Sequence, residues 1–290
     1  MAVAVKFLTP AVGAEILGVD LRRLSDAEFA DIAQVWHQRS ALLVRGQQID
    51  DDDLIRFSRR FGELDPPPNQ EHGRLSPPGY PDVYVVSNVL DASGQPIGAL
   101  GAGEAVWHTD MSYLELPPDA SMLYALEIPA AGGDTWICGM EAAWTALPEA
   151  LKEQLRGRRI KHDGTYNSGG FLRQGVEPTD DPHQAPGAWH PAVCRHPVTG
   201  APSLYLGRRR NSYVEGLSSA ASEALLDALW AHIDRPELRY EHKWRVGDLL
   251  LWDNRSTMHR RDPFDQSARR VMHRTQIKGG HRPQAHLAAA

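Results

Sequence analysis

The stretch Val106-Trp107-His108-Thr109-Asp110-Met111 places a histidine and a carboxylate two residues apart. In an extended strand, residues i and i+2 project from the same face, so the His108 imidazole and the Asp110 carboxylate can converge on one point. Such a pair supplies two of the three ligands in the two-histidine, one-carboxylate set that binds non-haem Fe(II) and leaves coordination positions open. His-x-Asp alone is a weak signal, because any exposed strand can carry it by chance. A metal site therefore requires a third ligand from elsewhere in the chain.

His259 is the candidate for that third ligand. It follows a turn after the apolar strand predicted at 249–252, and this arrangement can return a second imidazole to the face that carries His108 and Asp110. The chain has 13 histidines, so each one must be weighed against an ordinary structural role. The sequence assigns no metal-binding role to six of the other histidines, which are His37, His183, His190, His196, His232 and His242.

Composition excludes several classes of protein. Of the 290 residues, 42% are hydrophobic and 23% are charged, as in an ordinary globular protein with a sizeable core. The net charge of −6 argues against a nucleic-acid-binding protein, which would carry a basic excess. Only Cys138 and Cys194 are present, and they form no CxxC motif, so neither a disulfide framework nor a thiolate zinc site is expected. No signal peptide or membrane span is evident, and these features together predict a soluble cytoplasmic protein.

The hydrophobic pattern predicts many short strands with a few helices between them. Capping signals at 25–28 and 50–53 predict helix starts, and 218–233 reads as an amphipathic helix. Residues 238–244 alternate between apolar and polar as a half-buried strand does, and 271–277 is predicted as the last strand. These elements predict a mainly β fold with flanking helices, in a double-sheet jelly roll of the kind that cupins use. We expect one domain over 1–290.

Two loops and the C-terminal tail stand apart from this pattern. The region 66–81 is rich in proline and 94–105 is rich in glycine, so neither is expected to form a long regular element. Long loops in compact domains often cover binding sites, and we interpret both as lids. The tail at 279–290 is expected to be frayed.

Arginines near the C-terminus suggest a site for an anion. Arg270 and Arg274 lie four residues apart, so in a strand they project from one face. Two inward guanidinium groups would be costly without anionic partners, whereas they can bind carboxylates as bidentate forks. The alternative is a solvated edge strand. The run Arg208-Arg209-Arg210 could also attract anions, although such runs are more often solvated turns.

Several stretches in order along the chain resemble the taurine/2,4-dichlorophenoxyacetate dioxygenase family of Fe(II)- and 2-oxoglutarate-dependent enzymes. The resemblance runs from near residue 12 to near residue 278. The matching stretches are Gly13 to Leu21, Phe57 to Gly62, Trp107-His108-Thr109-Asp110, Gly132-Gly133-Asp134-Thr135, Gly247-Asp248 to His259, and Ala268-Arg269-Arg270. The resemblance implies the double-stranded β-helix, a jelly roll with helices packed outside.

The resemblance also implies roles for individual residues. His108, Asp110 and His259 match the iron ligands of the family. Thr135 matches a threonine whose hydroxyl meets a carboxylate of 2-oxoglutarate, and Arg270 matches the arginine that pairs with its distal carboxylate. Arg274 matches an arginine near the anionic group of the substrate or the near carboxylate of the cosubstrate. The implied cofactors are Fe(II), 2-oxoglutarate and O2, with succinate and CO2 released.

The substrate is expected to be a small anionic organic molecule. Glu104 departs from the taurine-specific branch, which has an asparagine there, and the stretches 162–168, 213–217 and 240–254 look closer to the aryloxyacetate-cleaving branch. This favours a carboxylate of the aryloxyalkanoate type, whose hydroxylated product would collapse with bond cleavage. The candidate substrate-binding residues are Glu104, Asn88, Trp107, Tyr113 and Arg274, and Trp252 is a further candidate for an apolar wall.

Three alternatives remain open from the sequence. Within the family, the substrate could be a sulfonate or a sulfate ester. Outside it, the same ligand set could serve a zinc-dependent hydrolase, which would leave Thr135, Arg270 and Arg274 without a role. A non-catalytic sensor that binds a small anion is the third alternative. The resemblance further suggests a homo-oligomer, a dimer or a tetramer.

Overall fold

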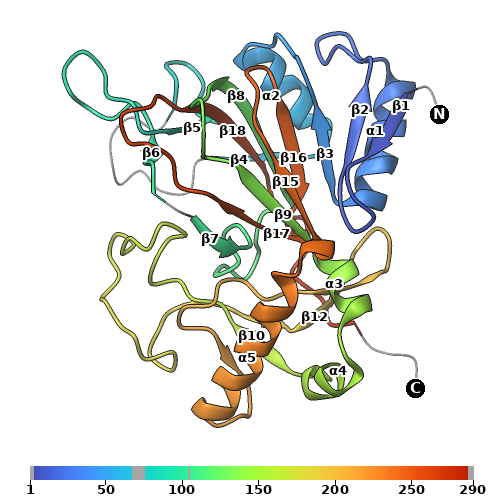
Figure 1. Ribbon diagram of the computed structural model, residues 1–290, viewed down its shortest axis with the longest axis vertical. Coiled ribbons are helices and arrows are strands. Elements are labelled where there is room, and N and C mark those ends of the chain that lie inside the picture. The colour runs from blue at the N-terminus through green and yellow to red at the C-terminus, as the bar shows by residue number, and fades with distance from the viewer. Residues whose placement is uncertain (1–2, 67–75, 104, 287–290) are drawn as a thin grey trace.

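The computed structural model describes residues 3–66, 76–103 and 105–286, and its centre is a pair of β-sheets (Figure 1). The larger sheet has nine strands. Along its main path these are β1 (Ala4–Phe7), β2 (Ala14–Leu17), β3 (Ala41–Val44), β16 (Leu249–Asp253), β8 (Ala120–Glu127), β18 (Val271–Ile277), β5 (Tyr84–Ser87) and β6 (Ala99–Leu100), with β4 (Leu64–Asp65) also paired to β18. The smaller sheet has the order β15 (Arg239–His242), β9 (Thr135–Gly139), β17 (Thr257–Arg261) and β7 (Ala105–His108).

The central strands of the large sheet are apolar on both faces. In β16, Leu249 and Leu251 pack into a core beneath the N-terminal helices, whereas Leu250 and Trp252 pack into a second core. That second core also contains Ile137 of β9, so it joins the two sheets. Because a strand alternates its side chains between faces, a strand buried on both sides needs the continuous apolar run seen here.

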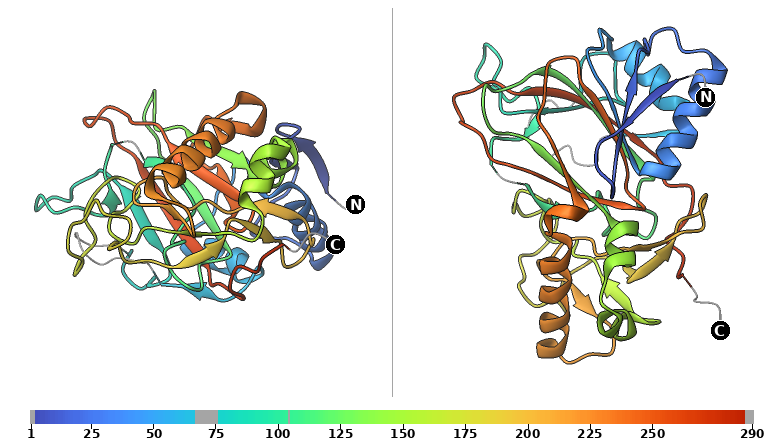
Figure 2. Two further views of the ribbon diagram at one scale, coloured as in Figure 1. Left: turned by 90° about the horizontal axis from the view of Figure 1, so that it is seen from below. Right: turned by 45° about the vertical axis from the view of Figure 1, so that its right-hand side comes forward.

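Helices and small sheets complete the fold around the two main sheets. Helices α1 (Asp26–Arg39) and α2 (Asp51–Arg59) lie at one end of the molecule, and α3 (Met140–Ala146), α4 (Glu149–Leu155) and α5 (Ser219–Ile233) lie toward the other (Figure 2). The remaining elements are the 3-10 helix η1 (Pro236–Leu238), a sheet of β11 (Trp189–Pro191), β10 (Arg159–Lys161) and β14 (Tyr213–Val214), and a pair of β12 (Val193–Arg195) and β13 (Pro202–Leu204).

The predicted helix starts are confirmed by their capping hydrogen bonds. Ser25 and Asp50 each accept from the backbone N–H three residues on, and Glu28 and Asp53 return the reciprocal bond. These boxes satisfy backbone donors that the first helical turn cannot pair internally. Among the described helices, none has the length and apolar character that crossing a bilayer requires.

The predicted fold class is confirmed, with three qualifications. The strand orders are open paths, so the sheets do not close into a barrel. The 94–105 loop contains the short strand β6, which pairs in parallel with β5. The prediction of a frayed tail is wrong for 284–286, where Gln284 and His286 form backbone hydrogen bonds with β12. Residues 67–75, within the first expected lid, lie outside the described parts of the chain. The lid roles and the single-domain assignment remain predictions.

Candidate active site

His108, Asp110 and His259 come together where β7 ends beside β17. His108 ends β7 and His259 lies directly opposite it on β17, with ring centroids 4.1 Å apart. Asp110 lies in the turn after β7, and its Oδ1 is 3.6 Å from His108 Nε2 and 3.7 Å from His259 Nε2. All three side chains are buried, and one ligand atom from each lies within 4.8 Å of the others. This is the spacing of a group that could hold one metal ion.

Hydrogen bonding and burial leave imidazole lone pairs available at this group. His108 Nδ1 lies 2.7 Å from the Val106 carbonyl oxygen, an acceptor, so Nδ1 carries the proton and Nε2 has a free lone pair. Burial, and then the neighbouring His108, lower the pKa of His259 well below its usual value. His259 is therefore neutral at physiological pH, which is the form that binds a metal.

The Asp110 carboxylate is ionised and held from behind. Burial favours its neutral form, but the charge of Arg274, together with the neighbouring His259 and His108, outweighs burial and holds the pKa of Asp110 well below its usual range. Arg274 Nη2 lies 2.6 Å from Asp110 Oδ2, and the Ser121 hydroxyl donates to the same oxygen at 2.8 Å. With Oδ2 engaged, Oδ1 faces the two imidazoles as a single ligand atom.

A cavity of about 810 Å³ opens from this group. Its polar lining includes Thr135, Arg173, Arg208, Arg261, Arg270 and Arg274, and its apolar lining includes Leu90, Leu123, Phe171 and Trp252. The volume is in the range of small-molecule sites, and a largely apolar lining with a few convergent polar groups is typical of them. The predicted apolar-wall position of Trp252 agrees with this lining.

Arg270 is a buried cation that has no counterion among the described residues. Its side chain is 2% exposed, and within the described chain its Nε and Nη2 atoms are buried and make no hydrogen bond. Burial, and then the neighbouring Arg261, lower the pKa of Arg270 to about 9, so the guanidinium stays charged at neutral pH. A buried charge is costly unless it is paired, so this arrangement suits an anionic ligand.

Thr135 and the turn before it border the same part of the cavity. The Thr135 hydroxyl accepts from Trp244 Nε1 at 3.0 Å, which leaves its own proton for a further acceptor. Gly133 has φ +72°, and a Cβ at this position would lie 3.4 Å from Arg270 Nε. Thr135 and Arg270 thus offer a hydroxyl and a guanidinium to one anion-bearing ligand, as expected for a dicarboxylate cosubstrate.

Only some of the proposed substrate residues line the cavity. Trp107 was expected to line the site, but it packs in the core around α5 and donates through Nε1 to Asp234. The reason is that adjacent residues in a strand face opposite sides, so His108 in the cavity sends Trp107 away from it. Tyr113 does not line the cavity, but its hydroxyl accepts a hydrogen bond from Arg173, which does. Glu104 lies outside the described residues.

Asn88 lines the cavity, but its amide is already in use. Its Nδ2 donates to the carbonyl oxygens of Gln266 and Ala268, and its Oδ1 accepts from the Arg270 backbone N–H at 3.0 Å. These bonds hold the chain just before β18. Asn88 is therefore placed to position Arg270, and direct contact with a substrate remains a prediction.

Three cavity arginines were not predicted as site residues from the sequence. Arg208 belongs to the triple-arginine run, where a solvated turn was the better interpretation, yet it is 7% exposed. Arg261 donates through Nη2 to the Leu100 and Gly103 carbonyls and so ties the 98–103 segment to β17. Arg173 comes from a loop without a motif. Only Arg208 had a sequence signal, and local charge pattern could not show which arginine of the run is buried.

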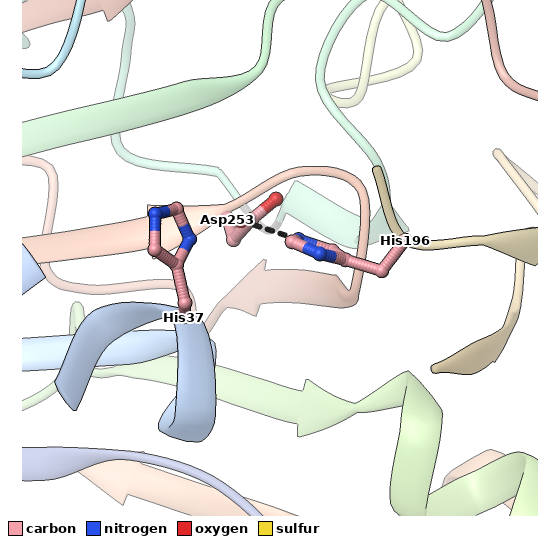
Figure 3. A group of neighbouring side chains, drawn as sticks. All are labelled: His37, His196 and Asp253. Atoms are coloured by element: carbon pink, nitrogen blue, oxygen red, sulfur yellow. Dashed lines mark hydrogen bonds and ion pairs between the residues drawn. The ribbon is translucent and has the colours of Figure 1, made fainter. Parts of the chain in front are cut away.

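A second histidine–carboxylate group, formed by His37, His196 and Asp253, is structural (Figure 3). His196 Nε2 pairs with Asp253 Oδ2 at 3.0 Å, and its Nδ1 accepts from the backbone N–H groups of Val198 and Thr199. Arg255 bonds both carboxylate oxygens of Asp253, at 2.8 and 2.6 Å. A metal would have to displace these bonds. The sequence missed the His196–Asp253 pair because its members are 57 residues apart.

Comparison with known proteins places the chain in a family. Residues 4–276 match the family described as taurine catabolism dioxygenase TauD, TfdA family. An alpha-ketoglutarate-dependent 2,4-dichlorophenoxyacetate dioxygenase from Cupriavidus pinatubonensis is 35% identical over 285 residues, covering 94% of this chain and 97% of that relative. An alpha-ketoglutarate-dependent sulfate ester dioxygenase from Pseudomonas putida is 32% identical, with 86% of this chain and 80% of the relative covered.

Comparison of the fold with solved structures leads to the same family. A solved structure of AAD-2 in complex with Mn(II) and N-oxalylglycine superposes with a TM-score of 0.79 at 28% identity, covering 98% of this chain and 100% of that one. The family match spans nearly the whole length of the chain, including both sheets and every residue of the candidate metal group. This chain is a member of the TauD, TfdA dioxygenase family.

Proposed function

We propose that this chain is an Fe(II)- and 2-oxoglutarate-dependent dioxygenase that hydroxylates a small anionic organic substrate. One observation carries the proposal. The His108, Asp110 and His259 group opens into the same cavity as the uncompensated guanidinium of Arg270. Two imidazoles and one carboxylate are the ligand set typical of non-haem Fe(II) oxygenases. The relatives named above, which depend on alpha-ketoglutarate, support the same chemistry.

The side chains divide the work of binding between them. His108, Asp110 and His259 would hold Fe(II), and Arg270 with Thr135 would hold the distal carboxylate of 2-oxoglutarate. When bound, Fe(II), 2-oxoglutarate and O2 supply an oxidative decarboxylation, to succinate and CO2, that is coupled to hydroxylation of a substrate carbon. Arg274 and Ser121 fix the orientation of Asp110, and Trp252, whose ring lies 4.6 Å from the His259 ring, shields that ligand from water.

The favoured substrate is a carboxylate of the aryloxyalkanoate type. Leu90 and Phe171 line the cavity and are 57% and 62% exposed, so they offer apolar contact to an incoming ring or chain. Hydroxylation next to an ether oxygen gives a hemiacetal-type product that cleaves spontaneously. The similarity to 2,4-dichlorophenoxyacetate and phenoxypropionate dioxygenases supports this choice. A homo-oligomeric state and a cytoplasmic location remain predictions from the sequence.

A sulfate ester or sulfonate is the second candidate substrate, and the Pseudomonas putida sulfate ester dioxygenase supports it. Both candidates share an anionic head and an apolar body, so the same cavity suits either. A zinc hydrolase is disfavoured, because a metal-bound water has no need for the buried Arg270 cation.

The test is substrate-dependent release of succinate from 2-oxoglutarate in air with Fe(II), assayed with phenoxyacetate, hexyl sulfate and taurine. The wild-type chain should release succinate with at least one of them. His108→Ala, which removes a metal ligand, should abolish the release, and His183→Ala, a change at a histidine outside the metal group, should not. Succinate release that is unchanged in His108→Ala would refute the metal assignment.

A further inference from the structure

We infer that His190 is a positioning residue for the metal group, because it fixes the turn that carries Asp110. This inference rests on the proposed function, in which Asp110 is a metal ligand. His190 lies on β11 and does not line the cavity, so it acts on the site through the backbone of the turn and not by contact with a ligand.

Asp110 is the member of the metal group that strand pairing does not fix. His108 and His259 face each other across the paired strands β7 and β17, whereas Asp110 lies in a turn two residues beyond the end of β7. Met111, the next residue, has φ +47°, a left-handed conformation that residues other than glycine rarely adopt. Such a backbone persists only where its surroundings hold it. The position of the Asp110 carboxylate therefore depends on contacts that hold this turn.

The turn is held at both of its ends. At its start, the Thr109 backbone N–H donates to the Gly207 carbonyl oxygen at 3.1 Å. At its far end, His190 Nε2 lies 2.8 Å from the Ser112 carbonyl oxygen and 2.9 Å from the Leu114 carbonyl oxygen. Both carbonyls are acceptors, so Nε2 carries the proton and donates to the two of them. His190 thus ties the far end of the turn to the sheet that contains β11.

The His190 ring is itself fixed by packing, so it can hold the turn in one position. It is 2% exposed, and strand pairing places it opposite Ile160 of β10. The ring meets the His162 ring edge-on at 4.9 Å and the Tyr205 ring edge-on at 5.4 Å. Burial lowers the pKa of His190, so the ring is neutral at physiological pH and its one proton serves the two carbonyls. A buried donor without these acceptors would be costly, which favours the bonded arrangement.

The chain contains a matched control for this hydrogen bond. His232 of α5 is also buried, and its Nε2 lies 2.8 Å from the carbonyl oxygen of Ala143 in α3. His232 does not line the cavity. Replacement of His232 by phenylalanine therefore removes the same kind of bond from between α5 and α3, and not from the Asp110 turn.

The experiment is titration of the metal-free protein with Co(II), followed by the visible absorption of the bound ion and by competition with a chelating dye. His190→Phe keeps a ring but removes the donor, and it should weaken Co(II) binding by about tenfold, as loss of a group that orients a metal ligand commonly does. His190→Gln, which returns an N–H donor at a similar reach, should recover most of that affinity. His232→Phe should stay within about twofold of wild type, because distant sites act independently.

Hydrogen exchange of the metal-free protein gives a second readout that does not involve the ion. Peptides covering 109–116 should exchange faster in His190→Phe than in wild type, because the turn loses its anchor. The same peptides should exchange at the wild-type rate in His232→Phe. A contribution of His190 to overall stability alone would predict similar changes in both variants.

The outcomes distinguish the positioning role from the metal assignment. If wild type binds no Co(II), or if His108→Ala binds it as tightly as wild type, the proposed metal group is wrong. If only wild type of these two binds Co(II), but His190→Phe keeps the wild-type affinity or His232→Phe loses as much, then His190 does not position the site. Should His190→Phe not fold, His190→Met fills a similar volume without an N–H donor, and wild-type Co(II) affinity in that variant is the refuting result.

Discussion

At the scale of single residues, the cavity is organised by how each buried arginine is compensated. Arg274 has the Asp110 carboxylate as its partner, and Arg261 has carbonyl oxygens. Within the described chain, Arg270 makes no hydrogen bond through Nε or Nη2, and Arg208 makes none through Nε. A guanidinium paired within the protein supports structure, whereas one left uncompensated raises the free energy of the empty protein and lowers it again when an anion binds.

This reasoning predicts a trade-off at Arg270. Arg270→Met should leave the ligand-free protein as stable as wild type or more stable, because a costly buried charge is removed. It should also weaken 2-oxoglutarate binding by about 10- to 100-fold, because a charge-assisted hydrogen-bond pair is lost. Thermal unfolding with and without Mn(II) and 2-oxoglutarate measures both effects. Arg269→Met is the matched control, since Arg269 is exposed and pairs with Glu127. A full ligand-induced shift in Arg270→Met would contradict the assignment.

Ser121 provides a test of how Asp110 is oriented. Its hydroxyl donates to Asp110 Oδ2 and accepts from Arg274 Nη2 at 3.0 Å. Ser121→Ala should therefore lower metal affinity by about tenfold, as loss of a partner behind a metal ligand commonly does. Competition with a chelating dye under anaerobic conditions gives the affinity for Co(II) or Fe(II). Ser58→Ala removes a buried hydroxyl away from the cavity and should not alter it; equal effects in the two variants would remove Ser121 from the metal site.

At the scale of elements, the cavity wall depends on a close parallel contact between β5 and β6. Val86 pairs with Ala99, and Gly98 lies so near that a Cβ there would be 2.3 Å from the Val85 carbonyl oxygen. Backbone cannot move aside as a flexible side chain can. Only glycine therefore lets the 94–103 segment approach the sheet and line the cavity.

Gly98→Ala should push β6 away from β5 and cost about 1–3 kcal/mol of unfolding free energy. Hydrogen exchange in peptides covering 94–103 should become faster, while β7 and β17, which carry the two metal-group histidines, keep their protection. Gly103→Ala is the control in the same loop, because a Cβ there meets nothing within 4 Å. If hydrogen exchange over residues 94–103 is equally fast in both variants, the β5–β6 contact does not position this wall of the cavity.

At the scale of the whole molecule, the buried Asp253 network ties distant segments together. Asp253 ends β16, Arg255 bonds it and also pairs with Asp119 at 3.3 Å, and His196 reaches it from the segment after β12. Burial favours the neutral carboxyl, but Arg255 and His196 outweigh burial and hold the pKa of Asp253 well below its usual value. The carboxylate is therefore ionised throughout the physiological range.

This network predicts a pH-dependent contribution to stability. A folded-state pKa below the unfolded value of about 3.9 means that the stabilisation is fully present above that pH and is lost as pH falls toward the folded pKa. Asp253→Asn should cost about 3–5 kcal/mol at pH 7, because Arg255 loses its buried partner. In urea unfolding, the difference in unfolding free energy between wild type and Asp253→Asn should become smaller below about pH 4. Asp20→Asn is the control, because Asp20 forms an exposed pair with Arg22, and it should change the unfolding free energy little at pH 7. If the stability difference between Asp253→Asn and wild type stays constant down to pH 3, the predicted loss of stabilisation at low pH is wrong.

Much of the metal group and fold was predictable because the relevant patterns are local. The two-residue spacing of His108 and Asp110, the capping boxes at Ser25 and Asp50, and the apolar run of β16 each depend on neighbours within a few residues. Backbone periodicity and helix-end hydrogen bonding act over a few residues, so they can be predicted from the order of residues along the chain. The identity of the third ligand, His259, needed the resemblance to a family as well.

What only the tertiary structure decided concerns which side chains end up buried and facing which partner. The sequence by itself determined a jelly roll with a histidine and a carboxylate two residues apart at one end of a strand. It could not tell that Trp107 turns into the α5 core, that residues 284–286 pair with β12, or that Arg208 enters the cavity while Arg209 reaches Glu223. These outcomes depend on contacts between segments far apart in the chain, and burial, which sets the cost of an unpaired charge, exists only after those segments have packed.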